Sequence, residues 1–86
     1  MFTLQIKRKA LGYIEKLDRT KKNLIKETLL LLKEDPVPVR ARDVSKLEGY
    51  DNVYRIRIGD LRIVYQVMWA ERVIIVNYIG PRGKAY

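Results

Sequence analysis

Apolar and polar residues alternate along the segment VYRIRIGDLRIVYQV, residues 53–67, and this alternation predicts two antiparallel strands. Gly59-Asp60 separates the two runs, and a two-residue loop with glycine first is typical of a type II′ hairpin turn. That turn would place Arg57 opposite Arg62. Because successive side chains point to opposite sides of a strand, the hairpin has two distinct faces. The apolar face comprises Tyr54, Ile56, Ile58, Leu61, Ile63 and Tyr65, and the arginine face comprises Val53, Arg55, Arg57, Arg62, Val64 and Gln66.

The segment before the hairpin carries one short strand and two helices. Phe2, Leu4 and Ile6 alternate with polar residues, which predicts a strand. Apolar residues then recur at helical spacing from Lys7 to Leu17, and again to about Lys33 after a break that holds two candidate N-caps. These are Asp18 and Thr20. The short connection predicts an antiparallel helix hairpin.

A third strand, residues 72–79, follows a predicted two-residue turn at Ala70-Glu71. In that register Tyr78 joins the apolar face and Ile79 lies opposite Arg62. Residues 40–47 are expected to be a linker. The chain is therefore predicted to be a single α+β domain, residues 1–86, with an N-terminal strand, an antiparallel two-helix hairpin and three antiparallel strands in one sheet, the helices packing on one face.

The amino-acid composition limits the ligands and catalytic groups that the chain can use. The net charge is +8, from 18 Lys+Arg and 10 Asp+Glu, which favours an anionic partner such as nucleic acid. The chain has no cysteine and no histidine, so it lacks thiolates, the usual zinc ligands and the usual neutral-pH general base. We expect no metal and no cofactor. No apolar run of 18 residues and no signal-peptide pattern are present, so we expect a cytoplasmic protein without a membrane anchor.

The arginine face should lower the stability of the fold, and this suggests that it has a function. Like charges placed opposite each other in a hairpin are destabilising by about 0.2–1 kcal/mol per pair, so Arg57 opposite Arg62 indicates a strongly negative ligand. Gly80 and Pro81 stop the last strand, which leaves the basic tail free to bring Arg82 and Tyr86 to the same place. A frayed basic terminus is the alternative.

Two segments carry a recognisable family pattern: KLEGYDNVYRIRIGDLRIVYQV and, at the end, YIGPRGKAY. Together with the order strand, helix, helix, three strands and basic tail, they make nearly the whole chain resemble the RelE toxins of the RelE/ParE superfamily. The most specific features are the run Tyr-Arg-Ile-Arg at 54–57, the run Arg-Ile-Val-Tyr at 62–65 and the closing Arg82 and Tyr86.

The resemblance implies a toxin that enters the ribosomal A site and cuts the mRNA codon there by attack of the neighbouring 2′-hydroxyl, leaving a cyclic phosphate and a free 5′-hydroxyl. It also implies a RelB-like antitoxin partner, in a toxin–antitoxin hetero-oligomer. The catalytic residues implied are Arg55, Arg57, Arg62, Arg82 and Tyr86, and Lys46 and Lys84 are expected to contact RNA at the periphery. Guanidinium groups suit this role because they bind phosphate oxygens bidentately.

Two features depart from the family pattern. Some relatives have lysine where this chain has Arg55 and Arg57, and arginine cannot give up a proton as lysine can. Tyr86 is also the last residue of the sequence, which places a carboxylate beside it. Two alternatives therefore stay open: a ParE-like gyrase inhibitor, and a catalytically weak binding or regulatory module of the same fold.

Overall fold

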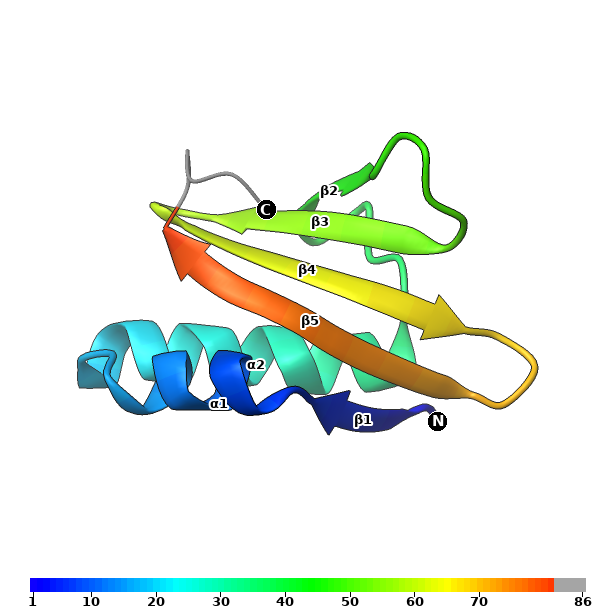
Figure 1. The fold of residues 1–86 in the computed structure, drawn as a ribbon. Helices are drawn as coiled ribbons and strands as arrows, with labels where there is room; N and C mark the ends of the chain where they lie inside the picture. The colour runs from blue at the N-terminus through cyan, green and yellow to red at the C-terminus, as the bar shows by residue number, and fades with distance from the viewer. Residues whose placement is uncertain (82–86) are drawn as a thin grey trace.

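The structure is a computed structural model that describes residues 1–81, and Figure 1 shows its two helices and five strands. The elements in chain order are β1 (Thr3–Ile6), α1 (Arg8–Glu15), α2 (Arg19–Glu34), β2 (Asp43–Lys46), β3 (Val53–Ile58), β4 (Leu61–Met68) and β5 (Val73–Pro81). The α+β prediction is confirmed, and the predicted helices match α1 and α2 to within a few residues.

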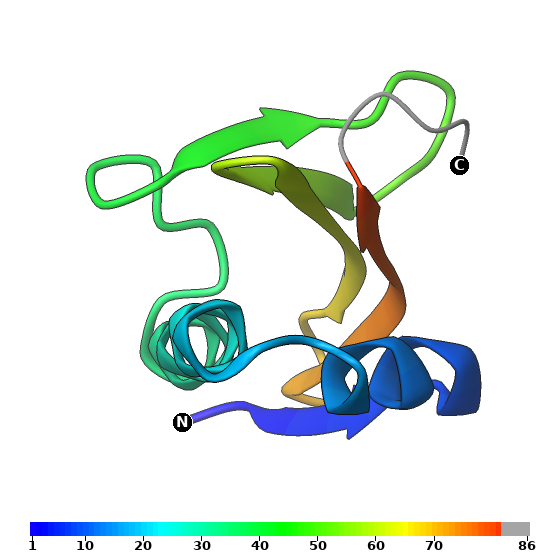
Figure 2. The same cartoon turned by 90° about the vertical axis from the view of Figure 1, so that its left-hand side faces the viewer.

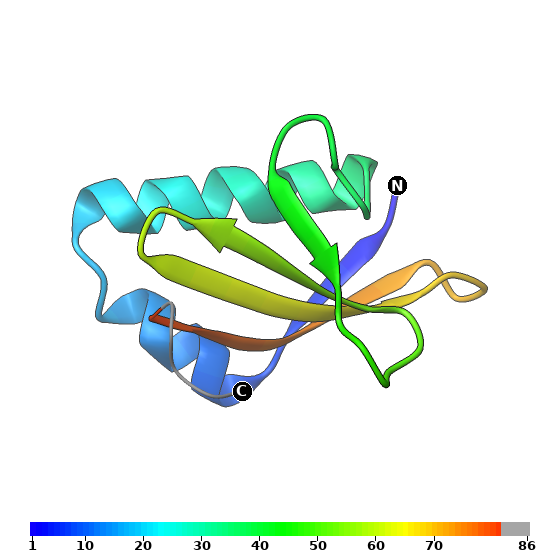
Figure 3. The same cartoon turned by 90° about the horizontal axis from the view of Figure 1, so that it is seen from above.

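All five strands form one sheet in the order β1-β5-β4-β3-β2, with β1 parallel to β5 and the other neighbours antiparallel. The prediction that residues 40–47 are a linker was wrong for half of the segment, because residues 43–46 form the strand β2. This strand pairs with β3 along its whole length, from Asp43 opposite Arg57 to Lys46 opposite Tyr54. Figure 3 shows β2 strongly inclined to the rest of the sheet at its edge.

The sheet curves around α2, so that this helix lies on the concave side (Figure 2). The helices run in opposite directions (Figures 1 and 3), as predicted. Their inward side chains and the apolar face of the hairpin form a single core. Its fully buried members include Ile25, Leu32, Ile56, Ile63, Tyr65, Ile74 and Val76. Since the apolar face is covered by the helices, the arginine face is the side of the sheet turned away from them.

The start of α2 is fixed by a side-chain cap. Asp18 lies in an extended conformation before the helix, and its carboxylate accepts a hydrogen bond of 2.9 Å from the backbone N–H of Lys21. We expect Asp18→Ala to lower the free energy of unfolding by about 1 kcal/mol, because one N–H of the first turn loses its partner. Urea denaturation measures this change. Thr20→Ala is the control, since Thr20 lies inside the helix, and an equal loss in both variants would contradict the assignment of the cap.

Candidate functional site

The β3–β4 hairpin has the predicted register. Ile58 pairs with Leu61 across Gly59-Asp60, and Arg57 pairs with Arg62. Gly59 has a φ of 57°, and Asp60 is not among the described residues with positive φ, as in a type II′ turn. The turn therefore places Arg57 and Arg62 side by side on the arginine face, with Arg55 in the adjacent row opposite Val64.

The three arginines differ in exposure. Arg57 is exposed, whereas Arg55 and Arg62 are half-buried and their Nε atoms are out of contact with solvent. The Nε of Arg55 has no hydrogen-bond partner among the described residues. Val64 is fully buried although it lies on the arginine face, which shows that neighbouring side chains cover the middle of this surface. Partial burial strengthens the interaction of a guanidinium group with an anion, because the local dielectric constant is lower than in water.

Two acidic residues form ion pairs near this surface. The carboxylate of Asp43 lies 3.8 Å from Nε of Arg57, its cross-strand neighbour. Both side chains are substantially exposed, so the pair contributes about 0–1 kcal/mol and can yield to a stronger anion. A surface ion pair with Asp60 is an alternative explanation for Arg62. Asp60 instead forms a 3.2 Å ion pair with Lys21 of α2, and this contact raises the pKa of the lysine.

The β4–β5 pairing corrects the predicted facing of two residues. The pairs from Met68 opposite Val73 to Tyr65 opposite Val76 have the predicted register. The loop before them is four residues long, not two, so β5 begins at Val73. The next residue of β4, Val64, lies opposite Tyr78 and not Asn77. Asn77 is therefore an unpaired extra residue in β5, which makes a β-bulge. As a result Ile79 turns into the core at 3% exposure, and Tyr78 lies on the arginine face.

Tyr78 and Gly80 therefore lie on the arginine face, a placement that the sequence pattern did not reveal. Gly80, not Ile79, lies opposite Arg62. A Cβ atom built on Gly80 would lie 2.6 Å from Cζ of Tyr78 and closer still to its hydroxyl oxygen. The Tyr78 ring thus lies flat along β5 over Gly80, in the row that also holds Arg57 and Arg62. A methyl group at this position would displace the end of the Tyr78 side chain.

This close approach predicts an energetic coupling. We expect Gly80→Ala to lower the free energy of unfolding by about 1–3 kcal/mol, because the new methyl group displaces the Tyr78 ring. In a Tyr78→Ala background the same substitution should cost clearly less, with a coupling of about 0.5–3 kcal/mol. A double-mutant cycle by urea denaturation measures it, and strictly additive effects would contradict the ring position.

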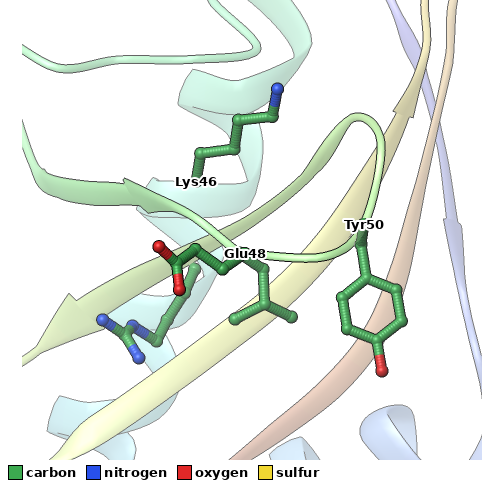
Figure 4. Close-up of a pocket in the computed structure, with 5 residues that line it drawn as sticks. Lys46, Glu48 and Tyr50 are labelled. Atoms are coloured by element: carbon green, nitrogen blue, oxygen red, sulfur yellow. The ribbon is translucent and has the colours of Figure 1, made fainter.

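Lys46 ends β2 opposite Tyr54, so the register places it on the apolar side of the sheet and not on the arginine face. It lines a hollow of about 490 Å³ together with Leu47, Glu48, Tyr50 and Arg55, which we call the β2–β3 pocket. Figure 4 shows Lys46 and Tyr50 extending to opposite sides of the loop, and the Glu48 side chain pointing away from Tyr50. The structure therefore brings Arg55, Arg57 and Arg62 together on one face, whereas Lys46 belongs to the opposite face and shares only the lining of the pocket with Arg55.

The remaining predicted site residues, Arg82, Lys84 and Tyr86, lie outside the described residues. A register with Ile79 opposite Arg62 would bring Arg82, three residues later, close to Arg62. The bulge changes that register by one residue, and Pro81 now pairs with Leu61. The approach of Arg82 and Tyr86 to the arginine face stays a prediction.

Within residues 1–81, no group of three or more acidic side chains is arranged to hold a metal ion. No helix in the same range is long and apolar enough to cross a membrane.

Comparison with known proteins gives the family. The family model described as the ParE toxin of the type II toxin–antitoxin system parDE matches residues 4–86. The chain is 36% identical to "Putative toxin RelE1" of Methanocaldococcus jannaschii over 85 residues, which covers 99% of this chain and 94% of the relative. This chain belongs to the RelE family of the RelE/ParE toxin superfamily.

Solved RelE structures share the fold described above. The archaeal RelE–RelB complex from Pyrococcus horikoshii OT3 matches with a TM-score of 0.87 and 32% identity over 98% of both chains. The isolated Escherichia coli RelE toxin matches with a TM-score of 0.80 and 28% identity, covering 99% of this chain and 88% of that one. This chain is thus a toxin of a type II toxin–antitoxin system, and the arginine face lies on the sheet of a RelE fold.

Proposed function

We propose that this RelE family toxin is a ribosome-dependent mRNA endonuclease that cuts the codon in the A site. The observation that carries the proposal is the placement of Arg55, Arg57 and Arg62 on one face of the sheet, with Arg57 and Arg62 directly opposite each other. Such a surface matches a phosphodiester better than any neutral ligand, because charge repulsion within it is relieved only by an anion.

The proposed reaction uses these side chains as charge stabilisers. The 2′-hydroxyl attacks the adjacent phosphorus and its proton passes to a base. The bond from phosphorus to the 5′-oxygen then breaks as that oxygen takes up a proton from a general acid or water, which yields a cyclic phosphate and a 5′-hydroxyl. Negative charge builds up on the phosphorane oxygens, and guanidinium forks bind such oxygens in pairs of hydrogen bonds. The half-buried Arg55 and Arg62 are placed best for this contact, and Arg57 would release Asp43 to join them.

The tail residues complete the proposal. Arg82 would add a fourth guanidinium group, and Tyr86 would stack on a base or accept the proton of the 2′-hydroxyl, since nearby arginines would lower its pKa from the usual value of about 10. Lys46 and Lys84 would contact phosphates at the periphery. Arginine at positions 55 and 57 restricts these two residues to charge stabilisation.

The partner proposed for this toxin is a RelB-like antitoxin. Solved relatives from P. horikoshii and E. coli are RelE–RelB complexes that match 98% of this chain. An acidic antitoxin would complement a net charge of +8 and hold the toxin inactive in a hetero-oligomer. The proposed site of action is the ribosome, hence the cytoplasm.

Primer extension on mRNA in translating ribosomes tests the proposed function. The purified toxin should produce cuts within A-site codons, and the same mRNA without ribosomes should stay intact. The alternative favoured by the ParE family description is gyrase inhibition. A supercoiling assay without ribosomes separates the two, because a gyrase inhibitor would block supercoiling and leave the mRNA uncut. Expression that is harmless without an antitoxin would point to the binding or regulatory module.

A further inference from the structure

The β2–β3 pocket lies directly beside the arginine face and shares Arg55 with it. Its volume of about 490 Å³ falls in the range of about 300–1,000 Å³ that is usual for small-ligand sites. The other walls come from the loop between β2 and β3, where Gly49 and Asn52 both have positive φ, at 83° and 60°. The pocket is therefore formed largely by a loop with a defined turn conformation, next to the proposed phosphate-binding surface.

The pocket walls carry three different kinds of recognition group. Tyr50 is 58% exposed, so its aromatic ring is accessible for stacking. Glu48 and Arg55 carry opposite charges and line the same hollow, yet no ion pair of 4.0 Å or less joins them among the described residues. The Nε of Arg55 is buried without a hydrogen-bond partner among these residues. Neither charged group is therefore neutralised by the other within the described residues.

A nucleotide fits this combination. Its base can stack on an aromatic ring, its phosphate can bind a guanidinium group, and N–H groups on its Watson–Crick edge can donate to a carboxylate. A carboxylate accepts hydrogen bonds but cannot donate them. It therefore favours bases that carry an amino group, namely adenine, cytosine and guanine, over uracil, whose edge carries two carbonyl oxygens beside a single N–H.

We infer that the β2–β3 pocket binds the base of the nucleotide whose phosphate contacts Arg55, with Tyr50 as the stacking surface and Glu48 as the group that selects amino-bearing bases. The inference rests on the proposed function and deepens it, because it assigns codon discrimination to the toxin's own loop. Lys46, which extends away from Tyr50, would contact the backbone and carry no base preference (Figure 4).

The first experiment measures cleavage rates on ribosomes programmed with mRNAs whose A-site codons differ at one position at a time. Stacking of one base is worth about 1–3 kcal/mol, so Tyr50→Ala should slow cleavage about 5- to 150-fold, and Tyr50→Phe should recover most of that loss. At one codon position the wild type should cut cytosine at least about 10-fold faster than uracil, and Glu48→Gln should remove the difference, because glutamine can also donate. Leu30→Ala and Glu27→Gln on the exposed surface of α2 are matched controls.

The second experiment separates failure of the inference from failure of the proposed function. Fluorescence anisotropy measures the affinity of each variant for hexacytidylate and hexauridylate RNA, without ribosomes or cleavage. If the wild type does not cut mRNA but prefers hexacytidylate in a manner that requires Tyr50 and Glu48, the nuclease proposal falls and the base site stands. If cutting occurs and all pocket variants match the wild type in both assays, the base site is overturned. Unchanged RNA readouts with a weakened antitoxin complex would also overturn it and assign the pocket to the protein partner.

Discussion

Arg62→Ala is expected to reduce the rate of A-site cleavage by about 10²–10³-fold, the largest effect of any single change within the described residues. Arg62 pairs with Arg57 in the row of the arginine face nearest the hairpin turn, and its Nε is buried. A preorganised donor of this kind stabilises charge in the transition state far more than in the ground state, so its loss lowers the rate of chemistry. Single-turnover cleavage on programmed ribosomes measures the effect directly.

The same assay includes two comparisons for Arg62. Lys26→Ala removes one positive charge from the exposed surface of α2 and should change the rate less than twofold, since exposed charges act weakly at a distance in physiological salt. Arg62→Lys keeps the charge but loses the planar fork, so it should recover only part of the rate. If Arg62→Ala and Lys26→Ala cut equally fast, then Arg62 takes no part in the reaction.

Tyr65→Ala is expected to lower the free energy of unfolding by about 3–5 kcal/mol, because it removes the largest fully buried side chain of the core. The Tyr65 ring stacks on Tyr54 at 5.8 Å, and its hydroxyl donates a 2.6 Å hydrogen bond to the carbonyl oxygen of Pro36. This bond ties the sheet to the segment that follows α2. Since small domains are stable by only about 5–15 kcal/mol, the variant should be close to unfolding at 37 °C. Tyr50→Ala, at an exposed tyrosine, is the control.

The hydroxyl group of Tyr65 can be tested separately. Tyr65→Phe keeps the ring and should cost about 1–3 kcal/mol, because the buried carbonyl of Pro36 loses its partner. Burial raises the pKa of Tyr65 above its usual value of about 10, so the folded state holds the proton more tightly than the unfolded state. Wild-type stability should therefore fall as the pH rises above 10, and this part of the fall should be absent in Tyr65→Phe. Parallel pH profiles of the two proteins would contradict the assignment.

The sequence predicted the hairpin correctly because its determinants are local. Gly59-Asp60 fixes the turn, the turn fixes the register, and alternation then assigns every side chain to a face. The bulge at Asn77 has no such local signal. It depends on how β5 fits between β1 and β4, and one extra residue is enough to exchange the facing of Tyr78 and Ile79.

The strand β2 was missed for a related reason. With four residues, of which only Val44 is apolar, it carries too little pattern to be distinguished from a linker. Its position is set by long-range contacts: pairing with β3, and the nearby Arg42, whose Nε donates to the buried hydroxyl of Thr28 on α2. Because β2 was not foreseen, neither was the pairing of Asp43 with Arg57.

The sequence predicted the charged residues of the candidate site but not the aromatic residues around them. The arginines could be named because charge and alternation are visible in the sequence. Tyr50 and Tyr78 could not, since an exposed loop position and a bulge decide their roles. Gly49 and Asn52 in the β2–β3 loop both have positive φ, and glycine and asparagine are residue types that commonly adopt it. These two residues are the sequence signal that the loop has a defined turn conformation.

The salt dependence of RNA affinity tests most directly whether the arginine face binds phosphate. Each contact with a single-strand phosphate contributes about 0.7 to the slope of log K against log salt concentration. Replacing Arg55, Arg57 and Arg62 together by glutamine should therefore reduce the magnitude of that slope by about 2, whereas glutamine at Lys9, Lys16 and Lys26 on the helices should leave it nearly unchanged. An equal slope in the wild type and the arginine variant, or a larger drop in the lysine variant, would contradict the account.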